Sequence, residues 1–201
     1  MRIHLASNNA KKLKELRRIL DGAGLHGVEI VPLSDVPPYP EPVEDAGNFA
    51  GNAIIKARAG VEATGLLSIA DDSGLCVDAL NGMPGVLSAR WSGSHGDDAA
   101  NNALLLSQME DVPDGKRGAA FVSTCALAIP DGEVVVSEGR WEGTILRACQ
   151  GENGFGYDPL FSPMETPGRS AAELSADEKD ALSHRGKALA GLVPEIAKLV
   201  R

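Results

Sequence analysis

Aromatic residues are scarce in this chain of 201 residues, where they make up 4% of the sequence. Hydrophobic residues still make up 43%, so we expect a packed core built mainly from Leu, Val, Ile and Ala. The length is enough for one large domain or for two small lobes that share a core. The few aromatic residues therefore stand out wherever they lie in glycine-rich loops.

Cysteine pairs, histidine pairs and long apolar runs are also lacking. The three cysteines, Cys76, Cys125 and Cys149, have no CxxC spacing, which favours reduced, buried thiols over a disulfide framework. The four histidines form no HxxxH or HxH pair, so the sequence does not predict a zinc site. Residues 1–7 are too short an apolar run for a signal peptide, and nothing approaches the ~20 apolar residues of a membrane span. We therefore expect a cytoplasmic protein without a membrane contact.

Positive charge is in deficit, because 28 acidic residues outnumber 19 basic ones and give a net charge of −9. This balance argues against broad electrostatic binding to DNA or RNA. It leaves room for one small anionic ligand in a local basic pocket.

The apolar pattern predicts an α/β protein that begins with a βαβ-like segment. Strands are expected at 2–7, 28–33 and 66–70, with helices from Leu13 to a stop at Gly24 and over 49–64. The remaining elements are expected to be a helix from Asp97 or Asp98 to about Met109, strands at 117–129, 133–140 and 142–148, a capping box at 175–178 and a helix at 188–200. Pro194 is expected to kink or restart the last helix.

A polar turn at residues 7–12 lies between the first strand and the first helix. Free backbone N–H groups and the helix dipole favour an anion at such a position, and Lys12 adds a charge suited to phosphate. The glycines of a Walker loop are missing. The alternative is a simple helix cap by Ser7 or Asn9 with solvated lysines.

Two adjacent carboxylates, Asp71 and Asp72, interrupt the apolar run from Ile69 to Leu80. We expect them at a strand end, where α/β proteins often carry their chemistry. Like charges this close usually need a cation or a proton to coexist, which suggests a metal site. The alternative is an Asp-Ser-Gly turn whose side chains bond to local backbone. Lys56, on the preceding helix, either faces solvent or reaches inward to a phosphate.

The loop at 151–161 places Phe155 and Tyr157 between glycines, with Asp158 directly after them. Rings in a flexible loop offer a platform on which a base can stack, and a carboxylate accepts hydrogen bonds from ring N–H donors. The alternative is a tight turn whose aromatic residues anchor it to the core. His184 and Arg185 are expected at a helix start, where an arginine is unfavourable for the helix dipole, and this favours a ligand role.

Together, these segments resemble the inosine/xanthosine triphosphate pyrophosphatase family, whose members cleave non-standard purine nucleoside triphosphates. The resemblance covers nearly the whole chain. It is carried, in this order, by Ser7–Lys12, Asn52-Ala53 with Lys56-Ala57, Ala70–Leu75, Gly154–Pro159 and Ser183–Gly186. Each segment alone is a weak signal, whereas all five in this order and spacing are specific.

The resemblance implies a mixed central sheet with flanking helices, in a single domain (residues 1–201) whose two lobes surround a deep cleft. It implies a homodimer with no nucleic-acid partner. It also implies a Mg²⁺-dependent reaction that converts a nucleoside triphosphate to the monophosphate and pyrophosphate.

By matched position, the resemblance makes Asp72 the general base and a metal ligand, with Asp71 and Glu44 also holding the metal. The triphosphate would be bound by Ser7, Asn8, Asn9, Ala10, Lys11 and Lys12, assisted by Lys56. Ser73 would contact substrate, and the base would be held by Phe155, Gly156, Tyr157, Asp158, Lys179, His184 and Arg185.

The segment before the second helix departs from the family pattern Glu-Thr-Gly-x-Thr-Phe-x-Glu-Asn-Ala. Alignment on Phe49 makes Glu44 the carboxylate on the metal side, whereas alignment on Gly47 makes it Asp45. We prefer Glu44, because that alignment needs no gap. Gly51 replaces the acid before Asn52, so we expect one supporting contact of the family site to be missing.

Two other functions are compatible with parts of this pattern. One is a Maf-like pyrophosphatase for modified pyrimidine nucleotides, and the other is a nucleotide-binding module without catalysis. The loop at 155–158 with His184-Arg185 favours purines over pyrimidines. The acidic cluster at Asp71 and Asp72 favours catalysis over binding alone.

Overall fold

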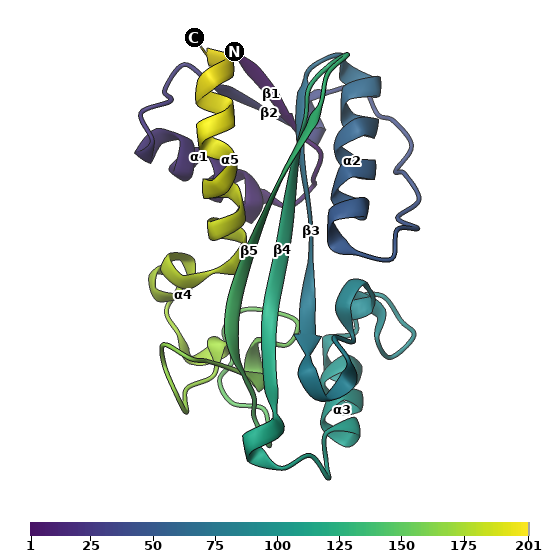
Figure 1. The fold of residues 1–201 in the computed structure, drawn as a ribbon, viewed down its shortest axis with the longest axis vertical. Helices are drawn as coiled ribbons and strands as arrows, with labels where there is room; N and C mark the ends of the chain where they lie inside the picture. The colour runs from purple at the N-terminus through teal and green to yellow at the C-terminus, as the bar shows by residue number, and fades with distance from the viewer. Residues whose placement is uncertain (201) are drawn as a thin grey trace. The chain divides into compact units, whose positions relative to one another are not determined.

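The computed structural model describes residues 1–200 and has a mixed α/β fold (Figure 1). The strands are β1 (Arg2–Leu5), β2 (Glu29–Pro32), β3 (Leu67–Val77), β4 (Gly118–Ala128), β5 (Val134–Ile145) and β6 (Phe161–Pro163). The α-helices are α1 (Ala10–Gly22), α2 (Phe49–Thr64), α3 (Asp98–Gln108), α4 (Ala176–Leu182) and α5 (His184–Val200). The strand order is β2-β1-β3-β4-β5-β6, with β1 parallel to β2 and β3 and with β6 antiparallel to β5. The predicted mixed sheet with flanking helices is confirmed.

The chain divides into two compact units. The first unit contains Met1–Asp72, Ser123–Gly139 and the segment from Arg185 onward, and the second contains Ser73–Val122 and Arg140–His184. Strands β3, β4 and β5 each begin in one unit and end in the other. The deep cleft expected between two lobes stays a prediction.

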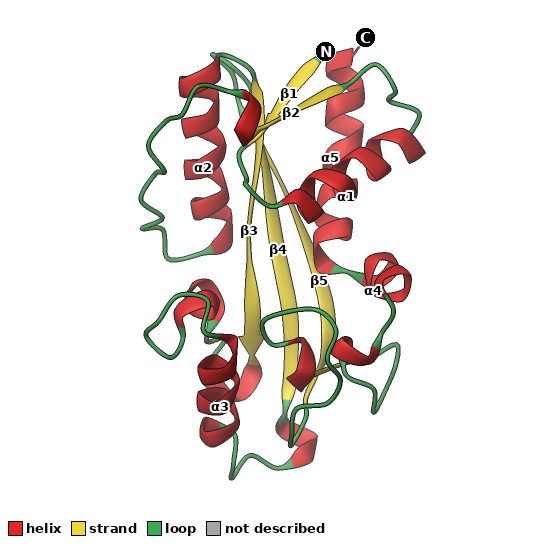
Figure 2. Ribbon diagram, turned by 180° about the vertical axis from the view of Figure 1, so that it is seen from behind, coloured by secondary structure: helices red, strands yellow, loops and turns green. Residues whose placement is uncertain are grey.

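Helices cover both faces of the strands in the first unit (Figure 2). Along β3, Ile69 packs with α1 and α5, whereas the next residue, Ala70, packs with the alanines of α2. This is the alternation that a strand imposes, since successive side chains point to opposite faces. Helix α2 comes close because Gly60 has no side chain, and a Cβ there would lie 2.2 Å from the Ser68 hydroxyl oxygen.

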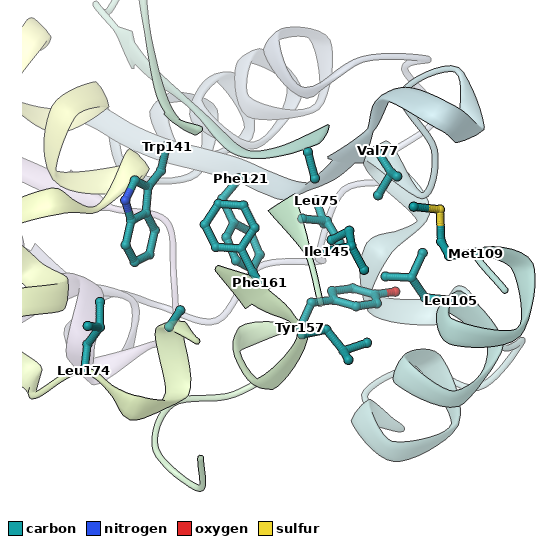
Figure 3. Close-up of a cluster of buried hydrophobic side chains, with 13 residues drawn as sticks. Leu75, Val77, Leu105, Met109, Phe121, Trp141, Ile145, Tyr157, Phe161 and Leu174 are labelled. Atoms are coloured by element: carbon teal, nitrogen blue, oxygen red, sulfur yellow. The ribbon is translucent and has the colours of Figure 1, made fainter. Parts of the chain in front are cut away.

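Four of the chain's eight Phe, Trp and Tyr rings lie in the core of the second unit (Figure 3). The ring of Phe161 makes edge contacts with Phe121 and Trp141, at centroid distances of 4.7 and 5.4 Å. Aromatic pairs in this geometry add to the stabilisation that their buried area gives. The other members of this cluster are Leu75, Val77, Leu105, Met109, Ala119, Ile145, Tyr157, Leu160, Ala171 and Leu174.

The predicted strand end and turn at residues 71–74 are wrong, because β3 continues through all four residues to Val77. These residue types favour turns, but here strand pairing and long-range charge partners hold them extended. Gly74 permits a close approach, since a Cβ there would lie 2.4 Å from both the Gly85 carbonyl oxygen and the Ser88 hydroxyl oxygen.

One further prediction about the second half of the chain is wrong, and another is wrong in part. The strands expected at 133–140 and 142–148 form one strand, β5, because Gly143 pairs with Pro163 of β6 and keeps the backbone extended. Helix α5 continues through Pro194, so the expected restart is wrong, whereas the kink that was the other expected outcome stays a prediction. Leu192 and Ile196 are buried on either side of this proline, so their packing outweighs the lost backbone hydrogen bond.

Candidate active site

Asp71 and Asp72 point to opposite faces of β3, because they are successive residues of one strand. Asp71 pairs with Lys12 and Arg185, and Asp72 pairs with Lys56. Each carboxylate therefore has its own cationic partners. These ion pairs balance the two adjacent negative charges within the chain itself.

The Asp71 carboxylate is enclosed between two helix starts. One oxygen lies 2.6 Å from the Lys12 Nζ in α1, and the other lies 3.2 Å from the Arg185 Nε in α5. The Asp71 side chain is only 5% exposed. Burial alone would raise the pKa of this carboxyl, but the Lys12 ammonium and the Arg185 guanidinium outweigh burial and hold its pKa well below its usual range. Asp71 is therefore ionised at neutral pH and anchors the two helix starts.

The Asp72 carboxylate faces helix α2. Asn52 and Lys56 lie four residues apart on one helix face, at 3.1 and 3.2 Å from the two carboxylate oxygens. Burial raises the pKa of Asp72, and the contacts with Lys56 and Asn52 offset only part of that rise. Burial would lower the pKa of Lys56, but the carboxylates of Asp72 and Glu44 outweigh it and raise that pKa. A carboxylate with a raised pKa beside a fixed ammonium group is suited to accepting a proton.

Glu44 joins this second group from the proline-rich loop before α2. Its carboxylate lies 2.8 Å from the Lys56 Nζ, so Glu44 and Asp72 share one ammonium group. Mg²⁺ in phosphate-handling sites commonly binds one or two carboxylates, with water and phosphate completing the shell. Glu44 and Asp72 fit such a site. Among residues 1–200, no group of three His, Cys, Asp or Glu side chains could hold a metal ion, and Asp71 does not join the pair.

The turn at residues 7–12 forms the helix cap that was the alternative interpretation. Asn9 caps α1, and its side-chain oxygen accepts from the backbone N–H groups of Lys11 and Lys12 at 2.9 and 3.4 Å. Ser7 accepts from the Asn9 N–H at 3.2 Å. Asn8, Asn9, Ala10 and Lys11 are exposed, and phosphate binding at this turn stays a prediction.

The two aromatic residues of the loop in the second unit differ in exposure, and each fits one of the two roles predicted for this loop, stacking on a base or anchoring the loop to the core. Phe155 is 53% exposed, and the Lys179 Nζ lies 5.0 Å from its ring centroid. Tyr157 is buried in the core, where its hydroxyl donates to the Ser88 carbonyl oxygen at 2.9 Å (Figure 3). Phe155 is therefore available to stack on a base, whereas Tyr157 anchors the loop.

Asp158 organises the same loop from within. Its carboxylate accepts from the Phe155 N–H at 2.8 Å and pairs with Lys179. Gly154 adopts a φ of 82°, and a Cβ there would overlap the Asp158 carboxylate. The structure thus brings Phe155, Asp158 and Lys179 together, and their contact with a base stays a prediction.

His184 and Ser73 complete the predicted set. The His184 ring stacks on Phe121, at 5.1 Å between centroids and an interplanar angle of 13°. Ser73 is half-buried in β3, directly after Asp72. Their predicted substrate contacts stay predictions.

The role of Asn52 was not predicted from the sequence. Its side-chain oxygen accepts from the Ala46 N–H at 3.0 Å while its amide nitrogen donates to Asp72, so it links the loop of Glu44 to β3. The four-residue spacing from Asn52 to Lys56 was the available signal, since both side chains must share one helix face.

A hydrogen bond between the buried His4 and the half-buried Tyr39 anchors the proline-rich loop that carries Glu44. The His4 Nδ1 lies 3.1 Å from the Val31 carbonyl oxygen, which only accepts, so Nδ1 donates there. Burial lowers the pKa of His4 and outweighs the contact with Val31, which favours the neutral ring. The Nε2 of a neutral ring then accepts from the Tyr39 hydroxyl at 2.9 Å.

Tyr39→Phe is expected to lower the free energy of unfolding by about 1–3 kcal/mol, because it leaves the buried His4 Nε2 without its donor. Urea unfolding at neutral pH measures this change. Ser34→Ala is the control, since it removes an exposed hydroxyl of the same loop, and it is expected to stay within about 0.5 kcal/mol of the unmodified protein. Equal stability of the two variants would contradict the anchoring role.

The chain is similar to known proteins over nearly its whole length. A sequence profile of the Ham1 family matches residues 3–195. The dITP/XTP pyrophosphatase of Corynebacterium glutamicum strain R is 68% identical over 202 residues, which cover 99% of this chain and 98% of that protein. The dITP/XTP pyrophosphatase of Mycobacteroides abscessus is 62% identical over 200 residues, covering 100% of this chain and 97% of that protein.

Two solved structures share the fold. The crystal structure of the nucleoside-triphosphatase / dITP/XTP pyrophosphatase from Mycobacterium abscessus matches with a TM-score of 0.83 and 63% identity, covering 98% of this chain and 100% of that one. The Ham1 protein of Staphylococcus aureus matches with a TM-score of 0.89 and 35% identity, covering 99% and 100%. In the described part of the chain, every helix falls short of the length and apolar character that a membrane span requires.

Proposed function

The chain belongs to the Ham1 family, and on that premise we propose that it hydrolyses non-standard purine nucleoside triphosphates, of the dITP and XTP class, to the monophosphate and pyrophosphate. The match to the Ham1 family agrees with the resemblance noted in the sequence. It favours a purine nucleoside triphosphate as substrate over the modified pyrimidine nucleotide of the Maf-like alternative. The observation that carries the proposal is the half-buried Asp72 carboxylate, which has a raised pKa and is held by Asn52 and Lys56.

Hydrolysis at the α-phosphorus requires a base for the attacking water and positive charge for the leaving pyrophosphate. Asp72 accepts the water proton, for which its raised pKa is suited. Lys56 stabilises the charge that develops on the phosphate oxygens, and Lys12 is the second candidate for that role. Asp71 stays ionised and orients Lys12 and Arg185.

We also propose Mg²⁺ as the cofactor, held by Glu44 and Asp72. When bound, it would acidify a coordinated water and neutralise phosphate charge. Asp71 is left out of this ligand set, because its two oxygens already contact Lys12 and Arg185 on the other face of β3. We further propose a homodimer in the cytoplasm, as the family resemblance implies.

Base selection follows from the chemistry at position six of the purine. Inosine and xanthine carry a keto oxygen there, whereas adenine carries an amino group. Donors from His184 and Arg185 would satisfy the keto oxygen and oppose the amino group. An unpaired buried polar group costs about 1–3 kcal/mol, which corresponds to about a tenfold to hundredfold preference over ATP.

A pyrophosphate-release assay tests this function. Purified protein is expected to release pyrophosphate from XTP, dITP and ITP in Mg²⁺, about tenfold to a hundredfold faster than from ATP, and to stop when EDTA removes the metal. GTP and dUTP complete the series, and dUTP represents the pyrimidine alternative. Hydrolysis of ATP as fast as ITP would overturn the account of base selection, and full activity in EDTA would overturn the metal proposal.

A further inference from the structure

We propose that helix α3 carries two positioning residues, Asp98 and Asn102, which fix the loop at 154–157 so that Phe155 is presented to the purine base. This inference rests on the proposed function, because that function supplies the purine base on which the exposed Phe155 ring would stack. No role was predicted for either residue from the sequence beyond a possible helix cap by Asp98.

The two side chains hold both backbone groups of one residue, Gly156. The Gly156 N–H donates to the Asp98 carboxylate at 2.7 Å, and the Asn102 side-chain amide donates to the Gly156 carbonyl oxygen at 2.8 Å. Asp98 and Asn102 are four residues apart, so one face of α3 presents both to the loop. The donor and the acceptor match the only hydrogen-bonding groups that a glycine has.

Gly156 is a point where the loop needs such support. It adopts a φ of 61°, in the left-handed region that glycine enters readily, and glycine is also the most flexible residue in the absence of fixed contacts. The preceding N–H, that of Phe155, is held by the Asp158 carboxylate at 2.8 Å. The peptide groups before and after Phe155 are therefore each held by a carboxylate, that of Asp158 and that of Asp98.

Helix α3 is itself firmly placed in the second unit. Leu105 and Met109 are fully buried in its aromatic-rich core. Asn101 accepts from the Ser92 N–H at 2.7 Å, and Asp97 caps the helix by accepting from the Ala100 N–H at 3.0 Å. Side chains that position a loop act well only from a rigid element, and α3 meets that condition.

Phe155 is the one exposed aromatic residue in the part of the chain that the structure describes, while the residues beside it are held in place. A ring fixed in this way loses little conformational freedom when a base stacks on it, so the fixed loop favours substrate binding. In the proposed function the chemical step takes place at the phosphate, whereas the ring stacks on the base. Loosening the loop should therefore raise KM and leave kcat almost unchanged.

The test compares Asp98→Ala with Asp98→Asn and with the control Asp97→Ala. Asp98→Ala is expected to raise the KM for XTP about tenfold, as the loss of one charge-assisted hydrogen bond implies, with kcat within about twofold. Asp98→Asn keeps an acceptor oxygen and is expected to restore most of the affinity. Asp97→Ala removes the cap of the same helix, so it is expected to lower the thermal midpoint and leave the KM unchanged.

An unchanged KM in Asp98→Ala, or an equal rise in Asp97→Ala, would overturn the inference. If Asp98→Ala does not fold, Asn102→Ser serves in its place, with the same expected rise in KM. Hydrogen exchange of the Phe155 and Gly156 amides gives a readout that does not depend on activity. Faster exchange in Asp98→Ala than in Asp97→Ala supports the positioning role, and equal exchange overturns it. Failure of the proposed function shows separately, as an unmodified protein that does not hydrolyse XTP.

Discussion

Asp72→Asn is expected to lower the turnover of XTP by about a hundredfold to ten-thousandfold while nucleotide binding is retained. The amide keeps the size of the carboxylate, and its one oxygen can still accept from Asn52 or from Lys56, but it cannot accept a proton from water. Steady-state kinetics give the loss of turnover. Isothermal titration with XTP gives the affinity, which is expected to change far less.

Asp45→Asn is the matched control for this experiment. Asp45 is an exposed carboxylate next to Glu44 on the proline-rich loop, and it was the alternative candidate for the metal side. Its substitution is expected to leave turnover unchanged, because Glu44, not Asp45, contacts Lys56. Near-normal turnover in Asp72→Asn would remove Asp72 from the role of base, and a large loss in Asp45→Asn would reassign the metal-side carboxylate.

Helix α2 and the start of α4 were predictable because their signals are local. Helix α2 spans residues 49–64, as expected, since Asn48 caps its start and Gly65 ends it with a φ of 68°. Ser175 and Glu178 form the capping box that their spacing predicts. In each case the residues that decide the structure lie within a few positions of one another.

The error at Asp71-Asp72 has the opposite cause. Asp71 is stabilised by Lys12, 59 residues before it, and by Arg185, 114 residues after it, and no local pattern shows that these groups meet. The same limit applies to the aromatic loop, where Tyr157 is an anchor because of Ser88, 69 residues away. The sequence indicated which residue types gather at the site, but their pairing depended on tertiary contacts.

Asp71→Asn is expected to lower the free energy of unfolding by about 3–5 kcal/mol at neutral pH. The substitution removes the negative charge between the Lys12 ammonium and the Arg185 guanidinium, and it leaves two partly buried cations facing an amide. Glu15, 4.0 Å from Arg185, compensates for only part of this loss. Urea unfolding followed by circular dichroism measures the change.

The pH dependence gives this prediction a second, independent test. Because the folded-state pKa of Asp71 lies below its ordinary value of 3.8, its ionised form contributes stability above that pH and loses it as the pH falls. The difference between the unmodified protein and Asp71→Asn should therefore be constant near neutrality and shrink below about pH 4. Glu29→Gln, which breaks the exposed pair with Arg2, should cost no more than about 1 kcal/mol. A loss as small as this in Asp71→Asn, or a difference that grows as the pH falls, would show that Asp71 is not the ionised anchor of the two helix starts.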